Sequence, residues 1–150
     1  MKTYIDTSVF GGFYDSDFEK ATKEFFKEIE KGYKIPYVSN LTVDELQNAP
    51  QKVKELFNVF FDKLKIVQVN KEVIDLANAY IKEKALTVKS MDDAIHIATT
   101  TVFNIGLIVS WNFKHIVNLN RIRIFNAVNI KLGYPVIEIR SPKEVLKTKN

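Results

Sequence analysis

The chain has 150 residues, 46% hydrophobic and 27% charged, with a formal net charge of +4. This length suits a single domain over residues 1–150 with a substantial core, and the mixed composition argues against disorder. The absence of cysteine excludes disulfides, thiolate zinc sites and cysteine nucleophiles, and two histidines are too few for an all-imidazole metal site.

The first half of the chain predicts three strands and three helices. Lys2 to Asp6 is a short β-prone run, and Gly11 and Gly12 predict a loop after it. Ser16 and Glu19 have the spacing of a capping box, which predicts a helix from there to about Gly32. A strand over 34–39 and a short helix capped by Asn40 or Thr42 come next. A further helix begins at Pro50, and a strand over 66–69 follows it. The residues expected on the inward face of that helix are Val53, Leu56, Phe57, Phe60 and Leu64.

The second half continues the alternation of helices and strands. Asn70 predicts the cap of one helix, and Ser90 opens another that runs through Phe103. We then expect a strand over 107–110, a loop or short helix over 111–120, a helix over 122–132, a strand over 136–139 and a capping box from Ser141 to Glu144. This order predicts an α/β fold with a mostly parallel sheet and helices on both faces.

Acidic and polar side chains follow the predicted strands. In parallel α/β sheets, ligands bind beyond the carboxyl ends of the strands. The residues expected there are Asp6, Glu45, Asp92, Asp93, Ser110 and Asn112. Each has an ordinary explanation as a turn or cap residue, Asp93 as the partner of Ser90 and Glu45 as that of Thr42. Clustered carboxylates repel one another unless a cation lies among them, so together they favour Mg²⁺ or Mn²⁺.

Four stretches resemble the PIN-domain family, most closely the VapC-type toxins of bacterial and archaeal toxin–antitoxin pairs. They are Asp6-Thr7-Ser8-Val9, Glu45-Leu46, Asp93 to Ala98, and the strand 107–110 followed by Trp111-Asn112-Phe113. The resemblance covers nearly the whole chain. It implies a three-layer α/β/α fold with a five-stranded, mostly parallel sheet, and a Mg²⁺- or Mn²⁺-dependent endoribonuclease that leaves a 5′-phosphate and a 3′-hydroxyl.

The resemblance also implies roles for individual residues. The metal ligands are Asp6, Glu45 and Asp93, and the fourth catalytic position is Asn112, where an amide keeps an oxygen but loses a charge. The supporting hydroxyl positions are Thr7, Ser8 and Ser110. Helical geometry turns Asp92 by about 100° from Asp93, so we do not expect both to bind one ion.

Other residues near the predicted site have two interpretations each. Lys114, Arg121 and Arg123 form either a solvated basic face or contacts to RNA phosphates. Trp111 and Phe113 are either buried anchors or platforms for bases. His96 favours a packed or surface role over contact with substrate. The phenylalanines at 57, 60 and 61 exceed what one helix face needs, which favours a homodimer interface or an antitoxin groove.

The preferred hypothesis is a metal-dependent endoribonuclease that acts on RNA as the toxin of a type II pair, with a cognate antitoxin as partner. The alternative is a catalytically weak PIN-like module that binds RNA or protein, which Asn112 favours. A receiver-type phosphoacceptor is disfavoured because the predicted third strand ends in Val69-Asn70 rather than in an aspartate. No apolar leader or stretch of membrane-spanning length occurs, so we expect a cytoplasmic protein without membrane contact.

Overall fold

A five-stranded parallel sheet forms the centre of the computed structural model, which describes residues 1–147. The strand order is β3-β2-β1-β4-β5, and every neighbouring pair is parallel. The strands are β1 (Lys2–Ile5), β2 (Ile35–Ser39), β3 (Lys65–Val67), β4 (Leu107–Val109) and β5 (Glu138–Arg140). The prediction of a mostly parallel sheet is confirmed.

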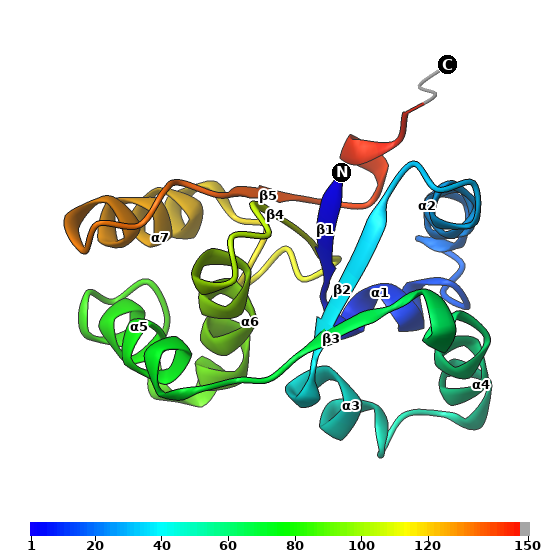
Figure 1. The fold of residues 1–150 in the computed structure, drawn as a ribbon, viewed down its shortest axis with the longest axis horizontal. Coiled ribbons are helices and arrows are strands. Elements are labelled where there is room, and N and C mark those ends of the chain that lie inside the picture. The colour runs from blue at the N-terminus through cyan, green and yellow to red at the C-terminus, as the bar shows by residue number, and fades with distance from the viewer. Residues whose placement is uncertain (148–150) are drawn as a thin grey trace.

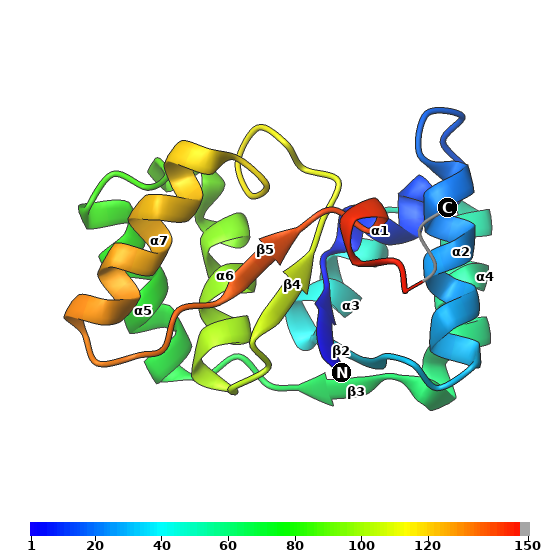
Figure 2. The same cartoon turned by 90° about the horizontal axis from the view of Figure 1, so that it is seen from above.

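Helices cover both faces of this sheet, so the predicted three-layer α/β/α architecture is confirmed (Figures 1 and 2). On one face lie α1 (Thr7–Gly12), α2 (Glu19–Glu30) and α4 (Gln51–Phe60), and on the other lie α5 (Lys71–Lys82), α6 (Met91–Val102) and α7 (Leu119–Lys131). The helix α3 (Asn40–Leu46) follows β2 directly, and short 3-10 helices span Phe61–Lys63, Val88–Ser90 and Lys143–Val145. No helix within residues 1–147 is long and apolar enough to cross a membrane.

Two hydrophobic cores lie on the two faces of the sheet. Because successive side chains of a strand point to opposite faces, Tyr4 and Ile108 enter the core formed with α5, α6 and α7. Their neighbours Ile5 and Val109 enter the core formed with α1, α2 and α4. Full burial of one such side chain contributes about 2 kcal/mol of hydrophobic stabilisation. The sheet is therefore held between two packed layers, which fixes where its strands end.

Several local signals gave the expected structure. Asn70 caps α5, with its Oδ1 accepting a hydrogen bond from the Val73 N–H at 3.0 Å. Ser141 and Glu144 exchange the two hydrogen bonds of a capping box. The predicted inward residues of α4 are buried. These features depend on residues close together in the sequence, so the sequence pattern alone identifies them.

The helix predicted to run to about Gly32 is present as α2, but the predicted loop at Gly11 and Gly12 and the predicted capping box at Ser16 were wrong. Gly11 and Gly12 lie in α1 rather than in a loop, because Asp6 caps this helix through the Ser8 N–H. The capping box at Ser16 does not form: α2 follows Phe18, which makes no side-chain cap bond within residues 1–147. The turn is made instead by the backbone carbonyl of Asp15, which accepts from the N–H groups of Phe18 and Glu19.

Other boundaries also differ from expectation. Ser39 is the N-cap of α3, so neither Asn40 nor Thr42 is; the Asn40 Oδ1 instead accepts from the Val69 N–H at 2.8 Å, beyond β3. The third strand begins before the predicted range and ends at Val67. The last helix begins earlier, at Leu119, and the last strand begins later, at Glu138. Edge strands of three residues carry too little local signal for exact boundaries.

Candidate active site

Asp6 lies at the centre of the carboxyl edge of the sheet. It follows β1, which pairs with β4 in the middle of the sheet, and is almost fully buried. Its Oδ2 accepts hydrogen bonds from the Ser8 Oγ at 2.6 Å and from the Ser110 Oγ at 2.8 Å. Ser8 and Ser110 thus hold one oxygen of the Asp6 carboxylate in a fixed orientation.

Glu45 reaches the same region from α3. Its Oε1 accepts from the Thr7 Oγ1 and from the His96 Nε2, each at 2.6 Å. Burial pushes the pKa of Glu45 up, but the hydrogen bond and charge of His96, together with the bond from Thr7, bring this pKa below its usual value. Glu45 is therefore a carboxylate held by two donors.

His96 is completely buried and connects Glu45 to the strand that carries Asp6. Its Nδ1 lies 2.6 Å from the Tyr4 hydroxyl, and its Nε2 lies 3.8 Å from the Asp6 Oδ1. Burial disfavours the charged imidazole, yet interactions with Tyr4, Glu45 and Asp6 raise the pKa of His96 well above its usual value. Of the packed and the surface position that the sequence left open for His96, the structure shows the packed one.

The sequence analysis missed the contact of His96 with the acids, although spacing offered a signal. Tyr4 and Asp6 are two residues apart along the chain at β1, and Asp93 and His96 are three apart on α6, so each pair shares a side of its element.

Asp93 lies in the first turn of α6. Its Oδ2 is 3.1 Å from the His115 Nδ1 and 3.4 Å from the Asn112 Nδ2, so its partners come from the segment after β4 rather than from Ser90. Burial and the negative charge of Asp6 raise the pKa of Asp93, and His96 and His115 offset only part of that rise. The carboxylates of Asp6 and Asp93 are therefore close enough for the charge of one to affect the pKa of the other.

Asn112 presents its amide nitrogen to Asp93. Its Oδ1 already accepts from the His115 N–H at 2.9 Å, within the tight turn that follows β4. The oxygen that would mimic a carboxylate ligand is therefore engaged in a local turn. Asp92, by contrast, is exposed and lies outside this group of contacts.

The three carboxylates suit a hard divalent cation chemically. Each uses one oxygen for the hydrogen bonds described above, namely Asp6 Oδ2, Glu45 Oε1 and Asp93 Oδ2, which leaves the second oxygen of each outside them. Within the described part of the chain, no three acidic or histidine side chains form a ready metal cage. Mg²⁺ usually keeps several water ligands and binds through one or two carboxylates, so it does not require such a cage.

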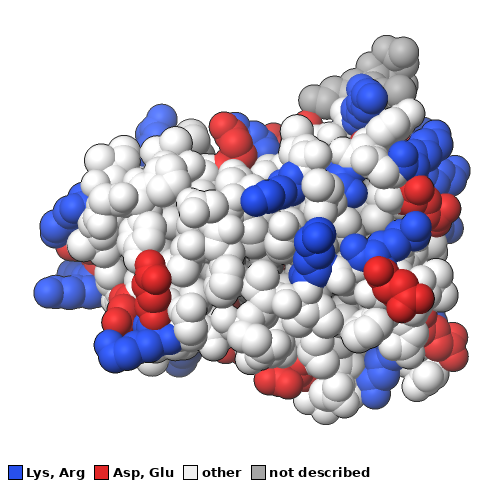
Figure 3. All heavy atoms as spheres, viewed as in Figure 1, with Lys and Arg blue, Asp and Glu red and all other residues white. Residues whose placement is uncertain are grey.

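The predicted basic residues do not act alike. Lys114 and Arg123 are exposed. The Arg121 guanidinium instead donates to two backbone carbonyls, from Nε to Lys114 at 2.8 Å and from NH1 to Ala85 at 2.6 Å. On the face shown in Figure 3, basic side chains are dispersed among acidic ones rather than gathered in one stripe.

The predicted aromatic residues also divide into two groups. Trp111 is an anchor, because its indole N–H donates to the Thr22 Oγ1 at 2.9 Å. Phe57 and Phe60 are buried in the core, whereas Phe61 and Phe113 are exposed.

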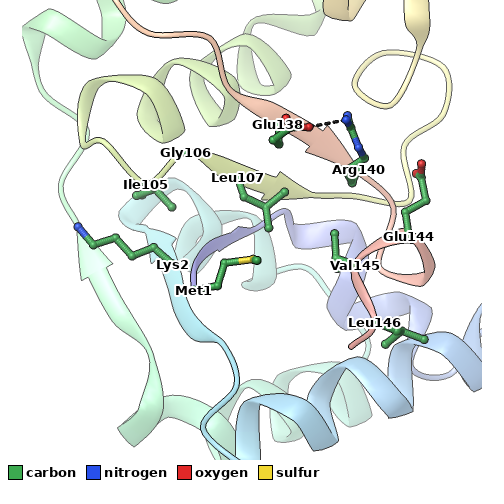
Figure 4. Close-up of a pocket in the computed structure, with 10 residues that line it drawn as sticks. All are labelled: Met1, Lys2, Ile105, Gly106, Leu107, Glu138, Arg140, Glu144, Val145 and Leu146. Atoms are coloured by element: carbon green, nitrogen blue, oxygen red, sulfur yellow. Dashed lines mark ion pairs between the residues drawn. The ribbon is translucent and has the colours of Figure 1, made fainter. Parts of the chain in front are cut away.

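A hollow of about 600 Å³ lies elsewhere, at the amino ends of β1 and β4 (Figure 4). Its lining residues are Met1, Lys2, Ile105, Gly106, Leu107, Glu138, Arg140, Glu144, Val145 and Leu146. None of the candidate acids contributes to it, and Glu138 and Arg140 form an ion pair with each other there. The candidate site is therefore identified by its acidic side chains and not by this hollow.

The structure is an α/β domain with a parallel sheet, and Asp6, Glu45 and Asp93 come from three of its segments. A family model described as PIN domain matches residues 3–114, a range that includes Asp6, Glu45, Asp93 and Asn112. Because this match spans most of the chain, the chain belongs to the PIN-domain family. PIN domains are generally nucleases, so this is a fold of enzymes that hydrolyse nucleic acids. Comparisons with curated proteins and with solved structures gave no match.

Proposed function

We propose that this protein is a divalent-cation-dependent endoribonuclease that hydrolyses RNA phosphodiester bonds. The observation that carries the proposal is the linkage of three carboxylates from separate segments: the His96 Nε2 lies 2.6 Å from the Glu45 Oε1 and 3.8 Å from the Asp6 Oδ1, and the charge of Asp6 raises the pKa of Asp93. These carboxylates belong to a chain of a nuclease family.

In this proposal Asp6, Glu45 and Asp93 hold Mg²⁺ or Mn²⁺. Ser8 and Ser110 orient the Asp6 carboxylate, and Thr7 orients that of Glu45. When bound, the cation would lower the pKa of water and offset the negative charge of the transition state. The residues of the chain contribute by fixing the carboxylates, so that little reorganisation is needed when substrate binds.

The test is cleavage of an end-labelled single-stranded RNA by purified protein, with Mg²⁺ or Mn²⁺ and with EDTA. We expect cleavage only with the cation, and products that carry a 5′-phosphate. Asp93→Asn should lower the rate by about 100-fold or more, as does loss of a group that stabilises transition-state charge. Asp92→Asn is the matched control, since it changes the adjacent, exposed aspartate of the same helix turn. Full activity in Asp93→Asn, or undiminished cleavage in EDTA, would contradict the proposal.

We further propose that the enzyme is the toxin of a type II pair, acts as a homodimer and is inhibited by a small antitoxin protein. The resemblance to VapC-type toxins supports this, as do the exposed apolar side chains of Val59 and Phe61 at the end of α4. Expression should arrest growth, and co-expression of a small protein from a neighbouring reading frame should relieve the arrest. If expression of Asp93→Asn arrests growth as strongly as the original protein does, the toxicity does not depend on the candidate site. Light scattering tests the dimer.

A catalytically weak RNA- or protein-binding module is the second candidate, and Asn112 favours it. Its amide places a neutral group beside Asp93, and its oxygen is engaged with His115. This candidate predicts binding of RNA or of a protein partner, with little or no RNA cleavage at any concentration of Mg²⁺ or Mn²⁺.

A further inference from the structure

We propose that the exposed ring of Phe113, with Lys114 beside it, forms a subsite on which an unpaired base of single-stranded RNA stacks next to the candidate active site. The proposal rests on the proposed function for the identity of the nucleic acid. It adds a requirement for unpaired substrate, which the acidic site alone does not impose.

The Phe113 ring is exposed but belongs to a fixed aromatic group. Trp111 stacks on Phe18, with ring centroids 4.3 Å apart and an angle of 14° between the planes. Phe113 lies edge-on to Trp111, with ring centroids 6.0 Å apart, and is tilted relative to Phe18, with ring centroids 6.2 Å apart. With 48% of its surface exposed, Phe113 presents apolar ring area to solvent from a support whose other rings are partly buried.

The support is tied to the same residues that hold the acids. The Trp111 N–H donates to the Ser8 Oγ at 3.0 Å, and Ser8 in turn donates to Asp6. Asn112, between Trp111 and Phe113, contacts Asp93. Figure 2 shows the segment after β4 and the turn between α1 and α2 on the same side of the molecule, the side toward which β1 and β4 run. Phe113 thus directly follows a residue, Asn112, that contacts Asp93.

The exposed apolar ring of Phe113 suits stacking with a nucleic-acid base better than contact with a charged phosphate. Stacking on an aromatic side chain is sequence-tolerant and contributes about 1–3 kcal/mol per base, because every base has a π-face. Bases inside a duplex already stack on their neighbours, so only an unpaired base is free to do this. Lys114 is exposed and directly follows Phe113, where its ammonium group can pair with the phosphate of the stacked nucleotide.

Trp111 provides a direct readout, because it is the only tryptophan of the chain and lies within the aromatic group. The experiment titrates the full chain with a single-stranded RNA decamer in EDTA at low salt, and follows tryptophan fluorescence. We expect saturable quenching, and no such quenching by the same sequence in a duplex. Phe113→Leu should weaken binding by about tenfold or more. Lys114→Gln should lower the slope of log affinity against log salt by about 1.

Tyr33→Leu is the matched control, since the aromatic ring of Tyr33 has a similar exposure, 43%, but lies between α2 and the amino end of β2. It should bind the decamer as the original protein does. Unchanged affinity in Phe113→Leu, or equal binding of duplex, would overturn the subsite. Binding is measured in EDTA and so does not depend on cleavage. If the decamer binds through Phe113 but the protein cleaves no RNA with Mg²⁺ or Mn²⁺, the proposed function is refuted and the subsite is not. Cleavage together with unchanged Phe113→Leu binding refutes the subsite alone.

Discussion

At the scale of single residues, the Tyr4 hydroxyl orients the imidazole that contacts Glu45. Tyr4→Phe removes the contact with the His96 Nδ1 and with the Ser39 Oγ, which lies 2.8 Å from the hydroxyl. We expect Mn²⁺ affinity to fall about tenfold, within the range seen when groups that orient metal ligands are removed. Stability should fall by about 1–3 kcal/mol. Calorimetric Mn²⁺ titration and thermal unfolding measure the two effects.

Tyr80→Phe is the control for this change. Tyr80 is also fully buried, and its hydroxyl donates to the Asn129 Oδ1 at 2.5 Å, among α5, α6 and α7. The Tyr80→Phe variant should lose about as much stability as Tyr4→Phe does, but it should keep the Mn²⁺ affinity of the original protein. An equal loss of affinity in both variants would show that the effect of Tyr4 is general destabilisation.

Asn112 also sets the charge of the site at this scale. Asn112→Asp places a carboxylate where the amide nitrogen is 3.4 Å from Asp93, so the two charges repel when no cation is present. We expect a lower melting temperature without metal and a larger rise on addition of Mn²⁺, measured by thermal unfolding. Asn78→Asp, at an exposed position on α5, is the control. If both variants respond to Mn²⁺ equally, Asn112 lies outside the reach of the cation.

At the scale of elements, the two glycines of α1 should respond oppositely to alanine. A Cβ at Gly12 would lie 2.6 Å from the Trp111 indole, whereas a Cβ at Gly11 meets nothing within 4 Å. Gly11→Ala should stabilise the protein by about 0.5–1 kcal/mol, because alanine favours a helix. Gly12→Ala should destabilise it by about 1–3 kcal/mol through overpacking and shift the tryptophan fluorescence. Chemical denaturation measures both, and a stabilised Gly12→Ala protein would contradict the close contact.

At the scale of the whole molecule, a buried ion pair connects segments far apart in the chain. Lys34, just before β2, pairs with Glu28 of α2, and Glu28 also accepts from the Lys147 N–H at 2.9 Å. Glu28→Leu should cost about 3–5 kcal/mol, because it leaves the Lys34 charge buried and unpaired. The double variant with Lys34→Met should recover much of that loss.

The exposed pair of Lys27 with Glu24 on the same helix is the comparison for the buried pair. Glu24→Leu should change stability by less than about 1 kcal/mol, because solvent screens the exposed pair. Urea denaturation of the variants gives all these values. A small effect of Glu28→Leu would mean that water reaches the pair.

The sequence by itself determined the order of the elements, the parallel sheet and the residues that follow its strands. Those features arise from neighbours along the chain, such as the Asn70 cap of α5, the β-prone residues of β1 and the apolar run of β4. The parallel arrangement then required Asp6 and Ser110 to meet at one edge, although 104 positions separate them. The sequence thus predicted which acids belong to the candidate site, and the family match covers the same residues.

Only the tertiary structure decided which partners these residues take. His96 contacts Tyr4 across 92 positions, the Asn112 oxygen is engaged in a turn, and the Arg121 guanidinium donates to two backbone carbonyls. The Trp111 indole lies so close to Gly12 that no Cβ fits there without a shift. Each outcome depends on which side chains packing brings within hydrogen-bond or contact distance. Local preference carries no information about such distances, because distant segments become neighbours only once the core has formed.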